Sequence, residues 1–162
     1  MENGSVVNYI RLKWSQIKTV GLDDAMLKLS KKIDYGLMAI SHIAFCEDDK
    51  KIVNTKRIAE EYSIPVELLA KILQKMAKGG LITSLNGPKG GYVLARLPRD
   101  ITVGEVVKAI EGPIELVDCH RGDDTDCQQL RKCSVRKPIR KIQDSINRLL
   151  DSITIEEITR LP

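Results

Sequence analysis

Apolar side chains recur at helical spacing in the first clearly patterned stretch of the chain. The pattern extends from Lys31 to about Phe45 and predicts an amphipathic helix with one buried face. The acidic and polar run EDDKK that follows would end this helix. The repeating apolar positions are Ile33, Leu37, Ile40 and Ala44.

Two further helices are predicted next, joined by a tight turn. Asn54 and Thr55 are suited to cap a short helix over Lys56–Tyr62. The turn SIP follows, and Pro65 suits the first turn of a second helix, Val66–Lys78, which would stop at a Gly-Gly pair. The positions expected to face inward are Ile58, Ala59, Leu68, Leu69, Ile72, Leu73 and Met76.

A β-hairpin is predicted directly after these helices. LITSL and YVLAR have the pattern of short strands, and the glycine-rich NGPKGG between them predicts a turn. Two helices joined by a tight turn form a helix-turn-helix, whose second helix enters the DNA major groove, and the hairpin makes it a winged helix. We therefore expect a mainly α fold with a small β-hairpin: a winged helix-turn-helix DNA-binding domain plus a long C-terminal dimerisation helix.

Two helices are expected after the hairpin. Thr102 would cap the first, which ends at Gly112-Pro113. The last helix, from about Pro138 to Ser152, carries a stripe that is too apolar to face solvent, and we expect it to pair with its mate in a symmetric homodimer. Packing within one subunit is the alternative. The stripe comprises Ile139, Ile142, Ile146, Leu149 and Ile153.

The patterning divides the chain into three parts. Residues 1–25 form an N-terminal extension of uncertain role, in which a short amphipathic helix is one option and a dispensable extension is the other. Residues 26–100 form the expected winged helix-turn-helix domain. Residues 101–162 form the expected ligand-binding loop and dimerisation helix.

Composition indicates a globular protein, with 43% hydrophobic and 30% charged residues in a chain of 162. No apolar run approaches the roughly 18 residues that span a bilayer, and we expect no membrane partner and a cytoplasmic location. Thiols stay reduced there, so clustered cysteines favour metal or redox ligands over disulfides.

The basic excess coincides with the expected DNA-binding domain. Residues 26–99 hold 13 Lys/Arg and 7 Asp/Glu, whereas residues 100–162 hold 10 and 12. Lysines along the second helix and at the hairpin tip can reach phosphate, and Gln74 can hydrogen-bond a base edge. A winged helix used only for protein contacts is the alternative. The candidate contacts to double-stranded DNA are Thr55, Lys56, Pro65, Glu67, Leu68, Lys71, Gln74, Lys75, Asn86, Gly87, Pro88 and Lys89.

Three cysteines lie in one polar segment, DCHRGDDTDCQQLRKC. Seven residues separate Cys119 from Cys127, and five separate Cys127 from Cys133. The segment has almost no apolar side chains and cannot fold by burying a core, so thiolate ligation of a metal centre is the candidate that would hold it. Structural zinc and a cluster-free thiol redox sensor are the alternatives, although structural zinc sites favour shorter gaps.

With these elements placed, the chain resembles the Rrf-two family of bacterial winged-helix repressors, which includes the Isc and Suf iron–sulfur assembly regulators. The resemblance runs from about Met26 to Ile158 and is carried by LSKKIDYGL, GPKGGYVLAR, ITVGEVVKAIEGPI and CSVR. The run EGPIELVDC together with CSVR is most similar to the Suf-type branch. The resemblance implies a homodimer on a two-fold operator and an iron–sulfur cluster, 2Fe-2S or 4Fe-4S, in each subunit.

By position, the resemblance implies that Cys119, Cys127 and Cys133 are the thiolate ligands. Some members use a histidine three residues after the last cysteine as the fourth ligand, but Arg136 stands there. Others use an acidic residue of the partner subunit, and Asp34 occupies that position. A surface ion pair is the alternative role of Asp34. The competing ligands are His120, expected at the surface, His42, expected as a satisfied helix histidine, and Cys46, expected as a buried thiol.

Nothing in the chain indicates an enzyme. The glycine-rich GPKGG lies between two short strands and does not open a helix, and the chain has only two histidines, with no Ser/His/Asp arrangement. We therefore expect a DNA-binding regulator with no small-molecule substrate, controlling iron–sulfur assembly or redox-stress genes.

Overall fold

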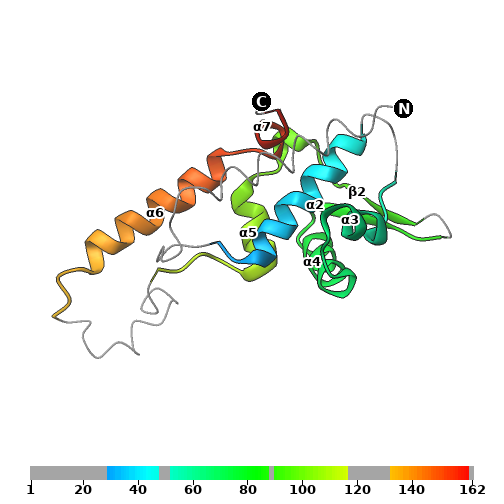
Figure 1. Ribbon diagram of the computed structural model, residues 1–162. Helices are drawn as coiled ribbons and strands as arrows, with labels where there is room; N and C mark the ends of the chain where they lie inside the picture. Colours follow the sequence, from blue (N-terminus) through cyan, green and yellow to red (C-terminus); the bar gives the residue numbers. More distant parts are fainter. Residues whose placement is uncertain (1–28, 48–51, 88–89, 117–131, 161–162) are drawn as a thin grey trace.

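The structure of the protein is a computed structural model. It describes residues 29–47, 52–87, 90–116 and 132–160. Figure 1 shows a body of helices and a hairpin, from which helix α6 projects to one side. The elements are α2 (Lys31–Glu47), α3 (Thr55–Tyr62), α4 (Val66–Lys78), β1 (Ile82–Leu85), β2 (Gly91–Leu94), η1 (Pro98–Asp100), α5 (Val103–Glu111), α6 (Arg136–Ser152) and α7 (Ile155–Arg160).

Helix α2 is the centre of the body and packs on α4, α5, α7 and β2. Its predicted apolar face is confirmed, since Ile33, Leu37 and Ile40 are at most 4% exposed. Gly36 lets α5 approach closely, because a Cβ atom there would collide with the Ile110 side chain. One apolar cluster includes side chains from α2 through α7.

The helix-turn-helix forms where the sequence predicts it. The Asn54 side chain accepts a hydrogen bond from the Arg57 N–H at 2.8 Å and caps α3. Ser63 ends α3 in the left-handed conformation, with φ of 53°, and turns the chain into α4. Leu68 was expected to be buried with its neighbours but is only partly buried, because it lies at the edge of the face that α4 turns to the core.

The wing is a two-stranded antiparallel hairpin that pairs Ile82 with Leu94 and Leu85 with Gly91. Strand β1 begins one residue after the predicted LITSL, and β2 is shifted to begin at Gly91, leaving out Ala95 and Arg96 of the predicted YVLAR. The hairpin is joined on its other side by Val53, which bridges Tyr92 just before α3. The wing is thereby fixed to the segment that leads into the helix-turn-helix.

Thr102 caps α5 in a complete capping box, as its side chain accepts from the Glu105 N–H while the Glu105 carboxylate accepts from the Thr102 N–H. The helix ends at Gly112, whose φ of 93° favours glycine. The predicted bounds of this helix are confirmed.

Helix α6 begins two residues before the predicted Pro138, at Arg136. The expectation that Ile153 belongs to its exposed stripe is wrong, because Ile153 lies beyond the helix end and packs partly buried on the core. Backbone hydrogen bonds of 2.9 Å from Val103 N–H to the Ile153 carbonyl, and from Ile155 N–H to the Ile101 carbonyl, anchor this end of α6 beside the start of α5.

Helix α7 was missed at the sequence level. It packs back on α2 and η1, and Ile155 is fully buried. Its six residues are too few for a helical repeat to stand out in the sequence, and contacts with the body stabilise it instead.

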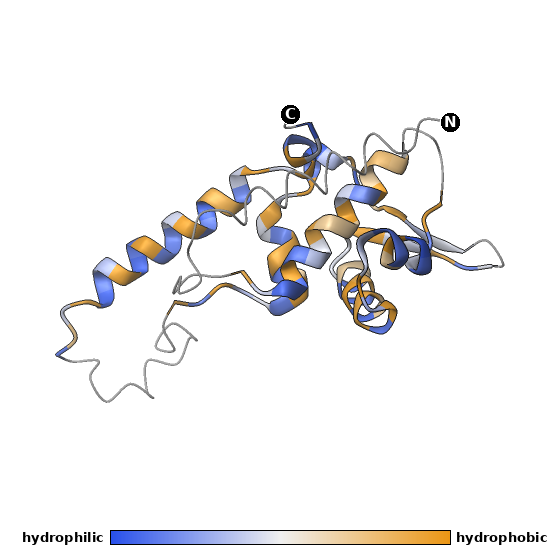
Figure 2. Ribbon diagram, in the orientation of Figure 1, coloured by the Kyte–Doolittle hydropathy of each residue, from blue (hydrophilic) through white to orange (hydrophobic). Residues whose placement is uncertain are grey.

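The apolar stripe of α6 is only partly covered within one chain, since Ile139 and Ile146 are partly buried whereas Ile142 and Leu149 are exposed. Ile142 is 52% exposed and Leu149 is 60% exposed, and Figure 2 shows apolar and polar residues alternating along the projecting helix. Exposed side chains of this size, repeated along one helix face, are typical of an interaction surface. In the described part of the chain, no helix is long and apolar enough to cross a membrane.

Candidate nucleic-acid interface and cysteine segment

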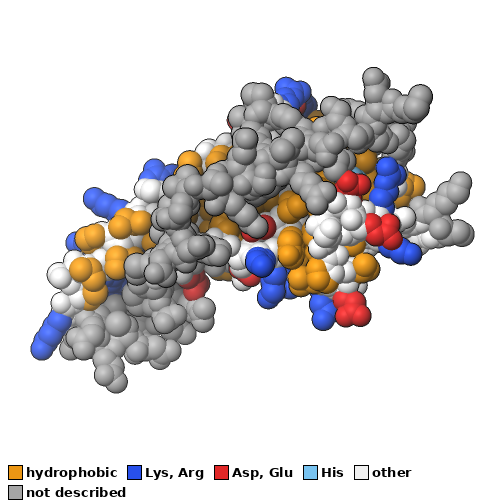
Figure 3. All heavy atoms as spheres, viewed as in Figure 1, with side chains coloured by type: hydrophobic (Ala, Val, Ile, Leu, Met, Phe, Trp, Pro, Cys, Tyr) orange, Lys and Arg blue, Asp and Glu red, His pale blue; other side chains and the backbone are white. Residues whose placement is uncertain are grey.

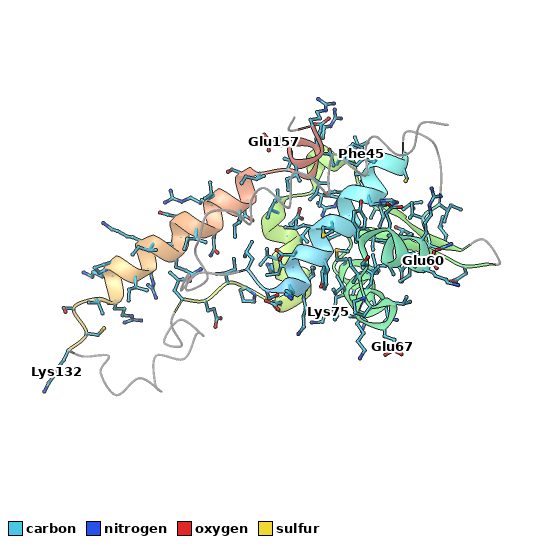
Figure 4. The ribbon with its side chains drawn as sticks, in the orientation of Figure 1. Phe45, Glu60, Glu67, Lys75, Lys132 and Glu157 are labelled. Carbon is cyan, nitrogen blue, oxygen red and sulfur yellow. The ribbon has the colours of Figure 1, made fainter. Side chains whose placement is uncertain are left out.

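Helix α4 buries one face and presents a polar one. Leu69, Leu73 and Met76 are fully buried, which fixes the helix against α2 and α5. Lys71 and Gln74 lie on the exposed face, together with Glu67 near the start of the helix. Figure 4 labels Glu67 at the outer end of α4, where it points away from the body. The helix therefore offers hydrogen-bonding side chains at its surface, as a recognition helix must.

Lys75 differs from the other lysines of α4. Its ammonium donates a hydrogen bond of 2.5 Å to the Ile110 carbonyl in the last turn of α5. A cation at the end of a helix satisfies a terminal carbonyl and interacts favourably with the helix dipole. Lys75 therefore ties α4 to α5 through its ammonium group, which the sequence analysis predicts to contact DNA.

The wing contributes Asn86 and Gly87, both exposed, and Gly87 has a φ of 129° that favours glycine. Pro88 and Lys89 lie outside the described residues. At the other side of the motif, Thr55 opens α3 and is partly buried, whereas Lys56 is exposed. Figure 3 shows Lys and Arg side chains bordering apolar ones in the region of α4.

His42 links α2 to α3, the first helix of the helix-turn-helix. Its Nδ1 lies 3.0 Å from the Tyr62 hydroxyl, while its Nε2 is buried with no hydrogen-bond partner among the described residues. Burial lowers the pKa of His42, the nearby Arg57 lowers it further, and Glu61 partly opposes both. The expectation of a fully satisfied helix histidine is therefore only half right.

The structure describes only the last two residues of the cysteine segment, Lys132 and Cys133. Cys119, His120 and Cys127 lie outside the described residues, and Cys133 is partly buried just before α6. Lys132, which precedes Cys133, lies at the outer end of α6, away from the body (Figure 4). Asp34 lies in the first turn of α2, within the body.

The described residues include no group of three or more His, Cys, Asp or Glu side chains that could hold a metal ion. Cys46 lies in the last turn of α2 and is partly buried rather than buried as expected.

Gln143 is a residue that the sequence analysis missed. It is 1% exposed, although the helix around it is largely at the surface. Its amide bonds to the backbone of Ile114 and Leu116, directly ahead of the cysteine segment. No spacing rule identifies such a residue, because a lone glutamine on a helix is normally solvated.

The structure is that of a winged helix-turn-helix DNA-binding protein. It combines a helix-turn-helix packed on the apolar core, a polar face on α4 and an attached hairpin. A family model described as "Rrf2: Iron-dependent Transcriptional regulator" matches residues 29–160. The chain therefore belongs to the Rrf2 family: it is a DNA-binding transcription regulator and not an enzyme.

Individual relatives agree with this assignment. The regulator NsrR of Bacillus licheniformis is 30% identical over 132 residues, which are 82% of this chain and 92% of that protein. The solved structure of CymR, the global cysteine regulator of B. subtilis, is 29% identical with a TM-score of 0.63, covering 83% of this chain and 97% of that one. IscR of T. potens is 33% identical with a TM-score of 0.63, covering 82% and 86%.

Proposed function

We propose that the chain is a homodimeric repressor whose affinity for a two-fold DNA operator depends on an iron–sulfur cluster, 2Fe-2S or 4Fe-4S, in each subunit. The ligands would be Cys119, Cys127 and Cys133, with Asp34 of the partner subunit as the fourth. The controlled genes would serve iron–sulfur assembly or redox stress. The branch with which the sequence resemblance is strongest, the Suf/Isc-type regulators, is part of this proposal.

One observation carries the proposal. The segment that holds all three cysteines is attached on both sides to α6. It leaves the body at Leu116, whose backbone is bonded to the middle of α6, and it rejoins the chain at the start of that same helix. Ligation of the three thiols would therefore constrain α6 at two places. Because α6 is anchored to α5 at its other end, a constraint on α6 would reach the DNA-binding body.

The donor set fits such a group. Thiolates are the usual ligands of iron–sulfur clusters, and a carboxylate is a harder, weaker fourth ligand that could exchange. Asp34 is in the first turn of α2, whereas Cys133 directly follows Lys132, which Figure 4 shows at the outer end of α6, so we expect a site that uses both to draw them from different subunits. When bound, the cluster would supply redox chemistry and a reversible cross-link of the loop.

The exposed stripe of α6 supports the dimer. A long helix that projects from the body and exposes Ile142 and Leu149 would be covered when two copies pair side by side. Residues 26–100 of each copy would then place one α4 in each half-site, about one helical turn of DNA apart. Movement of α6 would change this spacing, and a coupling of about 1–3 kcal/mol would alter operator affinity about 5- to 150-fold.

Anaerobic purification followed by an absorption spectrum and by iron, sulfide and zinc analysis tests the cluster directly. We expect a brown protein with similar amounts of iron and acid-labile sulfide. Cys127→Ala should abolish the colour, whereas the matched control Cys46→Ala should retain it. Stoichiometric zinc without sulfide would overturn the cluster and assign the thiols to a structural zinc site.

A further inference from the structure

Gln143 stands apart from the rest of α6. It is the buried residue of this helix, at 1% exposure, in an element whose larger apolar side chains Ile142 and Leu149 are exposed. A buried amide loses its hydration and must be compensated by hydrogen bonds. Its partners therefore identify what it holds.

The Gln143 amide bonds to the backbone on both sides of Glu115. Its Nε2 donates to the Ile114 carbonyl at 2.6 Å, and its Oε1 accepts from the Leu116 N–H at 2.8 Å. A neighbouring parallel β-strand makes the same pair of bonds, to the carbonyl before a residue and the N–H after it. The second Nε2 proton goes to the Asn147 Oδ1 at 3.2 Å, one turn along α6. Both donors and the acceptor of the amide are thus used.

This hydrogen bonding connects residues 114–116 to α6. Residues 114–116 lead into the segment in which Cys119 follows Leu116 by three positions. On the helix side, Gln143 lies about 100° round α6 from Ile142, so the amide and the apolar stripe occupy adjacent faces. A shift of residues 114–116 would rotate or displace α6 and, with it, the stripe.

An open pocket of about 180 Å³ lies between α5 and α6, lined by residues that include Pro113, Ile114, Asn147 and Leu150. Side chains do not fill the space beside this part of α6, so the three directional hydrogen bonds of Gln143 contribute to its position.

We infer that Gln143 is a positioning residue that transmits the state of the cysteine segment to α6 and hence to the spacing of the two DNA-binding bodies. This inference rests on the proposed function, because it concerns how the same segment acts on DNA. It adds a residue outside the ligand set and outside the DNA interface, with a role that depends on an uncharged amide able both to donate and to accept.

Two substitutions separate this role from simple packing. Gln143→Met keeps the length of the side chain and removes all three hydrogen bonds. Gln143→Glu keeps the shape and the acceptor for Leu116 N–H, but it places a carboxylate against the Ile114 carbonyl. Asp144→Asn, an exposed neighbour on the same helix, is the matched control. Asn147→Ala removes only the Asn147 Oδ1 acceptor of the Gln143 amide. It serves as a milder variant if circular dichroism shows that either Gln143 variant does not fold.

The measurement is the operator dissociation constant of each protein with and without its iron and sulfide, taken under nitrogen. In both Gln143 variants, we expect the ratio of the dissociation constants measured with and without iron and sulfide to lie within about twofold of one. The dissociation constant of the cluster-free protein should change less than about threefold. Asn147→Ala should give an intermediate ratio, and Asp144→Asn the wild-type ratio. In the cluster-free protein, hydrogen exchange at the Leu116 amide should accelerate at least about tenfold in Gln143→Met, because its acceptor is gone.

The outcomes are distinguishable. A wild-type ratio of one overturns the proposed function and the inference with it. A wild-type ratio far from one in either direction that persists in Gln143→Met and Gln143→Glu, or in Asn147→Ala if those do not fold, overturns the role of Gln143 alone. Faster Leu116 exchange together with an unchanged ratio would show that the hydrogen bonds are structural and do not transmit.

Discussion

Val53 and Tyr92 exchange a pair of backbone hydrogen bonds, with Tyr92 N–H to the Val53 carbonyl at 2.9 Å and Val53 N–H to the Tyr92 carbonyl at 3.4 Å. Val53 directly precedes the Asn54 cap of α3, so this bridge fixes the wing to the start of the helix-turn-helix. The wing and the start of the helix-turn-helix are thereby joined by backbone hydrogen bonds.

This close approach requires glycine at position 91. A Cβ atom there would collide with the Val53 carbonyl, and backbone atoms cannot swing aside as a side-chain end can. We expect Gly91→Ala to lower the free energy of unfolding by about 1–3 kcal/mol, measured by urea denaturation. Gly80→Ala provides a contrast. A Cβ atom at Gly80 would meet no neighbouring atom, so any loss of stability there would come from its backbone φ of 71°. Unchanged stability in Gly91→Ala would show that the bridge yields easily.

The exposed face of α4 makes a prediction about base recognition. Lys71→Ala and Gln74→Ala should each weaken operator binding by about 1–3 kcal/mol and relax base preference, since both side chains are free of the core. Lys89→Ala, predicted from the sequence to contact phosphate, should weaken binding to all sequences alike and make the salt dependence shallower. Lys108→Ala on α5 is the control, and titration of labelled DNA is the measurement. Equal affinity in all four variants would remove α4 and the wing from the interface.

Lys75→Ala should behave differently from Lys71→Ala. Because the Lys75 ammonium bonds the Ile110 carbonyl, its loss should lower protein stability as well as DNA affinity, whereas Lys71→Ala should leave stability within about 0.5 kcal/mol. Thermal unfolding of the DNA-free proteins checks this. Identical unfolding temperatures would mean that the tie between α4 and α5 adds nothing.

The His42–Tyr62 pair predicts a pH dependence of stability. Burial and Arg57 place the folded-state pKa of His42 below its ordinary value of 6.5, so the folded state favours the neutral ring. The unfolded chain therefore binds the proton more readily, and the stabilisation present above pH 6.5 is lost as the pH falls towards the folded-state pKa. Urea unfolding from pH 8 to pH 5 should show a steeper loss in the wild type than in His42→Gln. Parallel curves would contradict this account.

The stripe on α6 predicts a dimer that can be broken without unfolding the chain. Burial of one Leu or Ile side chain contributes about 1.5–3 kcal/mol, so Leu149→Ser and Ile142→Ser should each raise the dimer dissociation constant at least about tenfold. Their exposure within one chain means that the fold of each subunit should persist. Sedimentation and circular dichroism measure the two effects, with Arg140→Ser as the exposed control. A wild-type protein that is monomeric at micromolar concentration would contradict the proposed dimer.

The sequence alone determined the elements whose stability comes from their own pattern. The face of Ile33, Leu37 and Ile40, the caps at Asn54 and Thr102, and the bounds of α4 all follow from local rules of spacing and capping, and the structure confirms them. The winged helix-turn-helix class followed from the order of these elements. The three thiols could also be singled out, because a polar segment without a core needs another source of order.

Tertiary structure decided what depends on contacts between distant segments. Gln143 finds its partners 27 and 29 positions away, Lys75 bonds a carbonyl 35 positions away, and α7 forms because Ile155 is buried against the body. None of these partners is fixed by neighbouring residues, so no periodicity records them. Ile153 was assigned to the exposed stripe for the same reason: its spacing fits the helix, but the bonds between residues 101–103 and 153–155 end α6 before it and turn its side chain to the core.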